Sequence, residues 1–199
     1  MRRAALGGVV GPVVFVLSWA GLGAAKDGYS PLHDPISDLA AVHASTRVFM
    51  TVAFVVFTLG LVGYAWALRS ALTGPAWIAA LTTGIATLGV AAFPLDHSST
   101  VDSAHGVFAG IGYVTLAATA LLAVTPLARL DRKPWAVGAA VAGGLSALAL
   151  ALTLTGSLHG FFQRSGLTAG DIWVVTSALA IRAGAWTPDA SRAALPNSD

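Results

Sequence analysis

Long apolar runs separated by short polar segments are the dominant pattern of this chain. A bilayer core of about 30 Å requires about 20 apolar residues, each rising about 1.5 Å along a helix. Five runs have about this length and no internal charge, and a sixth is shorter and carries Arg182 near its end. The predicted transmembrane helices cover residues 4–25, 48–68, 76–94, 106–128, 135–157 and 168–186. The pattern therefore predicts an all-α, polytopic membrane protein with a bundle of six transmembrane helices.

Composition supports this fold class. Apolar residues make up 56% of the chain and charged residues only 10%, against about a quarter charged in soluble domains. No long linker interrupts the pattern, so we expect one domain over residues 1–186 and a disordered cytoplasmic tail over 187–199. The first apolar run exceeds the usual secretory h-region of about 7–15 residues, which favours a retained membrane anchor over a cleaved signal peptide.

The basic residues predict the topology, because Lys and Arg in short loops remain in the cytoplasm. With a cytoplasmic N-terminus, the basic residues left outside are Lys26, Arg47 and Arg164. The basic residues inside are Arg2, Arg3, Arg69, Arg129, Arg132, Lys133, Arg182 and Arg192. Eight basic residues inside against three outside favour six spans with both termini in the cytoplasm. With five spans the C-terminus would lie outside, and six basic residues inside would face five outside. We expect a multi-pass protein of the plasma membrane.

The residue types that the sequence lacks argue against several classes of function. The chain has no cysteine, which excludes disulfides and thiolate chemistry, and its net charge of +2 is explained by topology rather than nucleic-acid binding. In the predicted spans no Asp, Glu, Lys or His lies in the middle of a helix. Asp171 is expected near the outer end of the last one. A pump or coupled transporter is therefore disfavoured.

Polar residues gather on the predicted outer side, where all five histidines map. The first outer loop, Lys26 to Thr46, is long for a compact bundle. Within it Ile36, Leu39 and Val42 have the spacing of one helical face, which predicts a short interfacial helix. Asp34 followed by Pro35 is typical of a helix start, so a capping role is expected for Asp34.

The three outer loops supply a candidate polar site. Its members are Ser37, Asp38, Asp96, His105, Gln163 and Arg164. Arg offers a planar fork for anions, Gln both donates and accepts, and His titrates near neutral pH. We expect Asp38 to be partly shielded and paired with Arg164 or Arg47, and the side chains of the site to converge in one outward-opening pocket. Catalytic residues cannot be assigned from the sequence.

No cofactor is predicted, but a zinc ion remains an alternative. His97, His105 and His159 lie near three different helix ends, and zinc accepts neutral imidazole ligands. No local HExxH-type motif supports such a site.

Three segments carry a family resemblance: GYSPLHDPISDL after the first helix, FPLD before His105, and GFFQRSGL before Trp173. The chain resembles, over about residues 11–184, the family catalogued as domain of unknown function 998. The resemblance implies a small six-helix bacterial membrane protein without an assigned activity; His97 and His159 are not part of its pattern. Its recurrent positions would be Tyr29, Pro31, Ile36, Ser37, Asp38, Phe93, Pro94, Asp96, His105, Gln163 and Arg164. The ISD motif also resembles, more loosely, DRAM and Sfk-type membrane proteins, which are linked to lipid handling.

Two hypotheses for function follow. The first is a non-catalytic membrane protein that recognises or organises a lipid or polar headgroup at its outer face. The second is a membrane-embedded enzyme, such as a metal-dependent hydrolase, acting on a lipid-like substrate with Asp38, Asp96 and His105. The expected partners are the lipid bilayer and a lipid or headgroup ligand, without nucleic acid. The sequence leaves the ligand and the oligomeric state open.

Overall fold

The structure is a computed structural model that describes residues 3–156 and 158–186 of the 199-residue chain. The predicted all-α fold is confirmed, because within these residues every regular element is a helix. The elements are η1 (Ala4–Leu6), α1 (Gly7–Ala25), η2 (Ile36–Ala40), α2 (Arg47–Ala71), α3 (Ala76–Ala92), α4 (Ser99–Leu121), α5 (Val124–Arg129), α6 (Lys133–Leu152) and α7 (His159–Ala183). The predictions for the 187–199 tail, Arg2 and Arg192 lie outside the described residues.

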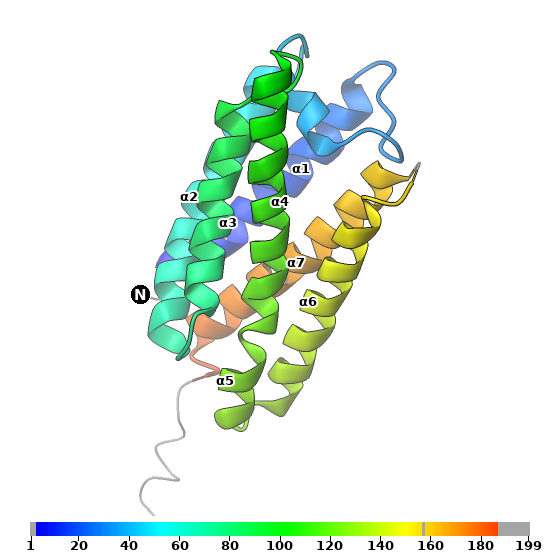
Figure 1. Cartoon of the computed structure of the whole chain (residues 1–199). Coiled ribbons are helices and arrows are strands. Elements are labelled where there is room, and N and C mark those ends of the chain that lie inside the picture. Colours follow the sequence, from blue (N-terminus) through cyan, green and yellow to red (C-terminus); the bar gives the residue numbers. More distant parts are fainter. Residues whose placement is uncertain (1–2, 157, 187–199) are drawn as a thin grey trace, which may run out of the picture.

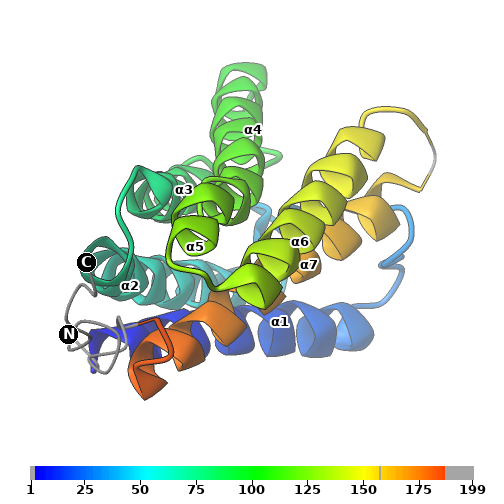
Figure 2. The same cartoon turned by 90° about the horizontal axis from the view of Figure 1, so that it is seen from below.

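The long helices α1, α2, α3, α4, α6 and α7 run up and down in one bundle (Figure 1). The connections that leave α1, α3 and α6 meet at one end, which we call the outer end, and the short helix α5 lies at the opposite end. Seen along the bundle, α7 packs between α1 and α6 (Figure 2), and it also contacts α2 and α4. Helix α7 is therefore the element that joins most of the others.

The helices have the apolar character of a multi-pass membrane protein. In the part of the chain that the structure describes, four are long and apolar enough to cross a membrane: Ala4–Ala25, Arg47–Ala71, Ser99–Arg129 and Lys133–Leu152. Large apolar side chains on their outer faces are exposed, as at Leu17, Leu59 and Val114, which suits contact with lipid. Helix α3 is apolar but shorter, and α7 carries two buried charged residues, Arg164 and Asp171. The direction in which the bundle crosses the membrane remains a prediction.

Four helix boundaries differ by five residues or more from the sequence-based predictions, and one of them is the end of α4 at Leu121 rather than near residue 128, after which the short helix α5 follows. Helix α4 begins at Ser99 rather than near residue 106, because the Ser98 hydroxyl caps it by accepting a 3.4 Å hydrogen bond from the Val101 amide. Helix α6 ends at Leu152 rather than near residue 157, and α7 begins at His159 rather than near residue 168. The early start of α7 was missed because its first turns are polar. As a result Asp171 lies in the middle of a helix, not near its outer end.

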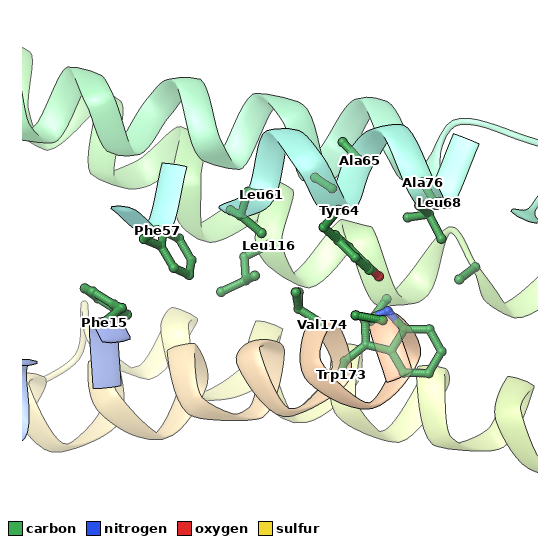
Figure 3. Close-up of a cluster of buried hydrophobic side chains, with 14 of the residues drawn as sticks. Phe15, Phe57, Leu61, Tyr64, Ala65, Leu68, Ala76, Leu116, Trp173 and Val174 are labelled. Carbon is green, nitrogen blue, oxygen red and sulfur yellow. The ribbon is translucent and has the colours of Figure 1, made fainter. Parts of the chain in front are cut away.

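The core lies along the faces that α2 and α7 turn toward each other. Figure 3 shows Phe15 of α1 facing Phe57 of α2, with Leu116 and Val174 filling the space beside them. The Phe15 and Phe57 rings have centroids 4.9 Å apart. Further inward, the hydroxyl of Tyr64 and the Ser177 hydroxyl share a 2.7 Å hydrogen bond, so the buried tyrosine leaves no polar atom unpaired.

Small residues set the closest helix approaches. Gly7 and Gly11 of α1 pack directly on Gly60 of α2, where an added Cβ on Gly7 would lie 2.5 Å from the Gly60 carbonyl oxygen. Gly106 and Gly110, which have the same four-residue spacing, face open space. The spacing alone therefore does not distinguish a packing pair from an exposed pair.

Candidate functional site

Gln163, in the second turn of α7, joins that helix to the first outer loop and to α4. Its side-chain oxygen accepts a 2.8 Å hydrogen bond from the Ile36 amide, at the start of η2. Its side-chain nitrogen donates to the Tyr113 hydroxyl on α4. Because both ends of the amide are used, the position of η2 is fixed relative to two long helices.

Arg164, the next residue, fastens the loop that precedes η2. Its Nη1 donates to the carbonyl oxygens of Pro31 at 2.8 Å, Asp34 at 2.9 Å and Gly160 at 2.9 Å. Its Nη2 donates to the Tyr29 hydroxyl. The guanidinium also lies 5.4 Å from the ring centre of Trp19 on α1. A buried charge is thus held by carbonyl dipoles and aromatic faces, without a carboxylate.

This arrangement corrects two expectations for the loop. Asp38 was expected to pair with Arg164 or Arg47, but Arg164 binds carbonyl groups, and Lys26 supplies the stabilising charge beside Asp38. Asp34 does not cap η2, because Pro35 is the capping position and has no side-chain hydrogen bond. The Asp34 carboxylate instead accepts a 2.7 Å hydrogen bond from the Ser30 amide and closes a turn.

A small cavity, here called the aromatic cavity, lies beneath η2 and has a volume of about 60 Å³. Its polar lining includes Ser37, His105 and Gln163, and most of the remaining wall is aromatic or aliphatic. The His105 Nδ1 lies 2.7 Å from the Phe93 carbonyl oxygen and is the donor, because a carbonyl oxygen can only accept. A cavity needs a volume of about 10–15 Å³ for each water that it holds. The cavity therefore has room for a few waters or a short hydrocarbon segment.

A larger depression, here called the outer pocket, has a volume of about 470 Å³. Its charged or titratable lining residues are Lys26, Asp27, Asp38, His43 and Asp96. The Lys26 ammonium donates a 3.0 Å hydrogen bond to the Asp38 carbonyl oxygen, and the Val42 amide donates to the Leu95 carbonyl at 3.0 Å. These contacts hold the first and second outer loops together around the pocket.

The electrostatics of the outer pocket are set by its carboxylates. Burial raises the pKa of the half-buried Asp38 carboxyl, and the negative charges of Asp34 and Asp96 raise it further. Lys26 and His159 act in the opposite direction without cancelling the effect. An added positive charge in this pocket would therefore be favoured, because it would offset the repulsion among the acids.

The six predicted site residues are divided between these two spaces. Ser37, His105 and Gln163 line the aromatic cavity, whereas Asp38 and Asp96 line the outer pocket. Arg164 lines neither and holds the loop between them. The sequence did not identify Lys26, His43 or Tyr113 as members of the site. The only available signal for Lys26 and His43 was their position in the same outer loop as Asp38.

The structure does not support a zinc site within its described residues. Residues 3–156 and 158–186 contain no group of three or more His, Asp or Glu side chains that could hold a metal ion. His97, His105 and His159 therefore do not form the three-histidine set considered from the sequence.

Comparisons with known proteins identify one family. A family model described as "Protein of unknown function (DUF998)" matches residues 9–180. No curated protein and no solved structure matches. The looser resemblance to DRAM and Sfk-type proteins thus gains no support.

Proposed function

The chain belongs to the DUF998 family, and from that premise we propose that it is a lipid-binding membrane protein whose outer pocket holds a zwitterionic headgroup. The observation that carries the proposal is that Asp38 and Asp96 both line one pocket that also contains Lys26. The two acids come from different loops, so their meeting depends on the folded bundle.

The charge pattern of the pocket favours a ligand that bears both signs. A primary ammonium group would place its N–H donors against the carboxylates of Asp38 and Asp96. A phosphate would accept hydrogen bonds from the Lys26 ammonium and from a ring N–H of His43. A purely anionic headgroup would instead meet three acidic side chains, Asp27, Asp38 and Asp96. Phosphoethanolamine has the required combination of groups.

The sizes of the two spaces assign them different roles. The outer pocket, at about 470 Å³, falls within the range of about 300–1,000 Å³ for small-molecule sites. The aromatic cavity, at about 60 Å³, is too small for an acyl chain. The headgroup therefore enters the outer pocket while the chains of the lipid remain in the bilayer.

The enzymatic alternative has weaker support. It requires Asp38, Asp96 and His105 to act on one substrate, because general acid–base groups must reach the same reacting atoms. His105 lines the aromatic cavity and donates to Phe93, whereas the two acids face the outer pocket.

Lipid competition tests the proposal. The purified chain is equilibrated with equal amounts of phosphatidylethanolamine and phosphatidylglycerol, and bound lipid is counted by native mass spectrometry. We expect phosphatidylethanolamine to be preferred by about tenfold, since one charged hydrogen bond contributes about 1.5–3 kcal/mol. The double variant Asp38→Asn/Asp96→Asn removes the preference, and the control Asp102→Asn retains it. Equal binding of the two lipids by the unmodified chain refutes the proposal.

A further inference from the structure

Asp171 is an acidic residue at the centre of a long helix. It is the middle residue of the 25-residue helix α7, His159–Ala183, and so lies about 18 Å from either helix end at 1.5 Å per residue. Ionisable groups at this depth are costly and are characteristic of functional sites in membrane proteins. The outer pocket and the aromatic cavity do not include this residue.

Among the residues that the structure describes, the Asp171 carboxyl group has no hydrogen-bond partner. The side chain is 3% exposed, and both carboxyl oxygens are buried without a hydrogen bond. The nearest cation along α7 toward its start, Arg164, already binds carbonyl groups near the outer end. An isolated buried carboxylate is too costly to persist. The group therefore requires either a proton or a cation that the described residues 3–156 and 158–186 do not supply.

The position of Asp171 on α7 shows which neighbour it meets. Arg164, Asp171 and Ala178 are seven residues apart and share one helix face. Arg164 lies over Trp19, and Ala178 packs near Gly8, both on α1. Asp171 thus faces α1 between these contacts, at the level of Pro12 and Val16.

An apolar groove of about 340 Å³ runs between α1 and α7 at this level, and Asp171 is among its lining residues, with both carboxyl oxygens buried behind the apolar wall. Val13, Leu17 and Ile172, also in the lining, are exposed on the outside of the bundle by 43%, 67% and 57%. Because these side chains face the hydrocarbon region, the groove is reached from the lipid phase. Its volume is near the lower end of the range of about 300–1,000 Å³ for small-molecule sites.

We propose that this groove binds a lipophilic amine, a primary amine on a single hydrocarbon chain, with Asp171 as its counter-ion. The amine enters from the bilayer in its neutral form, with its chain along Val13, Leu17 and Ile172. The protonated Asp171 carboxyl transfers its proton to the amine nitrogen. This step forms one N–H bond and breaks one O–H bond, and it leaves an ammonium–carboxylate pair in an apolar site.

The groove does not suit an inorganic cation. Hard metal ions take about six or more oxygen ligands, whereas the lining offers only Asp171 and the hydroxyls of Thr168 and Thr176 as side-chain oxygens. The Thr176 hydroxyl already donates to the Ile172 carbonyl oxygen at 2.7 Å. A lipophilic ammonium needs only one carboxylate and an apolar wall, and both are present.

Binding of dodecylamine to the full chain tests the proposal, with dodecanol as the matched ligand that lacks a basic group. We expect dodecylamine to raise the Tm of the unmodified chain by several degrees more than dodecanol. The Tm of the Asp171→Asn variant should shift by the same amount with dodecylamine as with dodecanol. Dicyclohexylcarbodiimide, which modifies protonated carboxyl groups in apolar surroundings, should label Asp171, and bound dodecylamine should lower the sum of the N-acylurea and dodecylamide products at this residue. The labelling is measured by peptide mass spectrometry of the unmodified chain and so does not depend on the folding of Asp171→Asn.

A second pair of variants tests the groove without changing the carboxyl group. Val13→Trp fills the groove and should abolish the dodecylamine shift, whereas Val10→Trp places the same side chain on an exposed α1 position outside the lining and should retain it. Equal shifts with dodecylamine and dodecanol in the unmodified chain identify a groove for hydrocarbon alone and overturn the proposal. Labelling of Asp171 that dodecylamine does not reduce also overturns it.

Discussion

The side-chain oxygen of Gln163 accepts a 2.8 Å hydrogen bond from the backbone amide of Ile36, 127 positions earlier in the chain. The same side chain donates to Tyr113, so one amide group joins the first outer loop, α4 and α7. The attachment of the first outer loop to α4 and α7 therefore depends on an uncharged side chain.

Replacement of Gln163 tests this connection. Gln163→Leu keeps the approximate volume but leaves the Ile36 amide and the Tyr113 hydroxyl without their partner. We expect a loss of about 1–3 kcal/mol for the unsatisfied buried amide, measured by thermal unfolding in detergent. Ser165→Ala, which removes an exposed hydroxyl bonded only within α7, is the control. A loss no larger than that of the control contradicts the role of Gln163.

Arg164 should not tolerate lysine. Arg164→Lys retains the charge but loses the planar fork that reaches Pro31, Asp34 and Tyr29 at once. Each lost charged hydrogen bond contributes about 1.5–3 kcal/mol, so the variant should unfold earlier and expose residues 29–36 to protease. The exposed Arg47→Lys serves as the control. Equal protease resistance in the two variants would show that Arg164 does not hold the loop.

Gly160 is required by a close backbone approach. A Cβ at this position would lie 2.6 Å from the Asp34 carbonyl oxygen and 3.0 Å from that of Pro31. Gly160→Ala should therefore lower the Tm by displacing the loop. Gly106→Ala meets nothing within 4 Å and should stabilise its helix by about 0.5–1 kcal/mol. A Tm change of the same sign in both variants would refute the predicted contact.

The raised pKa of Asp38 gives a pH dependence of defined sign. Because the folded pKa lies above the ordinary value of 3.8, the folded chain binds the proton more tightly than the unfolded chain. The stability that this proton provides is present below the ordinary pKa and is lost as pH rises through the folded pKa. Asp38→Asn should then be more stable than the unmodified chain at neutral pH, with the difference closing toward pH 4.

Thermal unfolding between pH 4 and pH 7 measures this effect, with the exposed Asp27→Asn as the control from the same pocket. The expected rise in stability of Asp38→Asn at neutral pH is opposite to the loss that would follow for a carboxylate stabilised by a salt bridge. Destabilisation of Asp38→Asn at neutral pH would show that the attraction of Lys26 outweighs the cost of burial.

The predicted topology can be tested by cysteine labelling, because the chain contains no cysteine of its own. Ser45→Cys lies beside the outer pocket and Ser70→Cys near the opposite end of α2. In intact cells a membrane-impermeant maleimide should label the first variant and spare the second until the cells are opened. The reverse pattern would invert the topology.

The sequence alone determined the all-α membrane fold, because an apolar run long enough to cross a bilayer is a local property that needs no knowledge of packing. It also identified the outer loops as the polar region, and the motifs around Ser37, Asp96 and Gln163 led to the DUF998 family. The sixth helix was harder to delimit: its first turns contain Gln163 and Arg164, and these polar side chains depend on hydrogen bonds to Ile36 and Pro31, each more than one hundred positions away.

Only the tertiary structure decided how the polar residues are grouped. Neighbours such as Ser37 and Asp38 face different spaces, and Lys26 rather than Arg164 supplies the stabilising charge beside Asp38. The burial of Asp171 likewise depends on the packing of α1 against α7. Such groupings arise from contacts between distant segments, and residue spacing does not encode which side chains meet across a bundle.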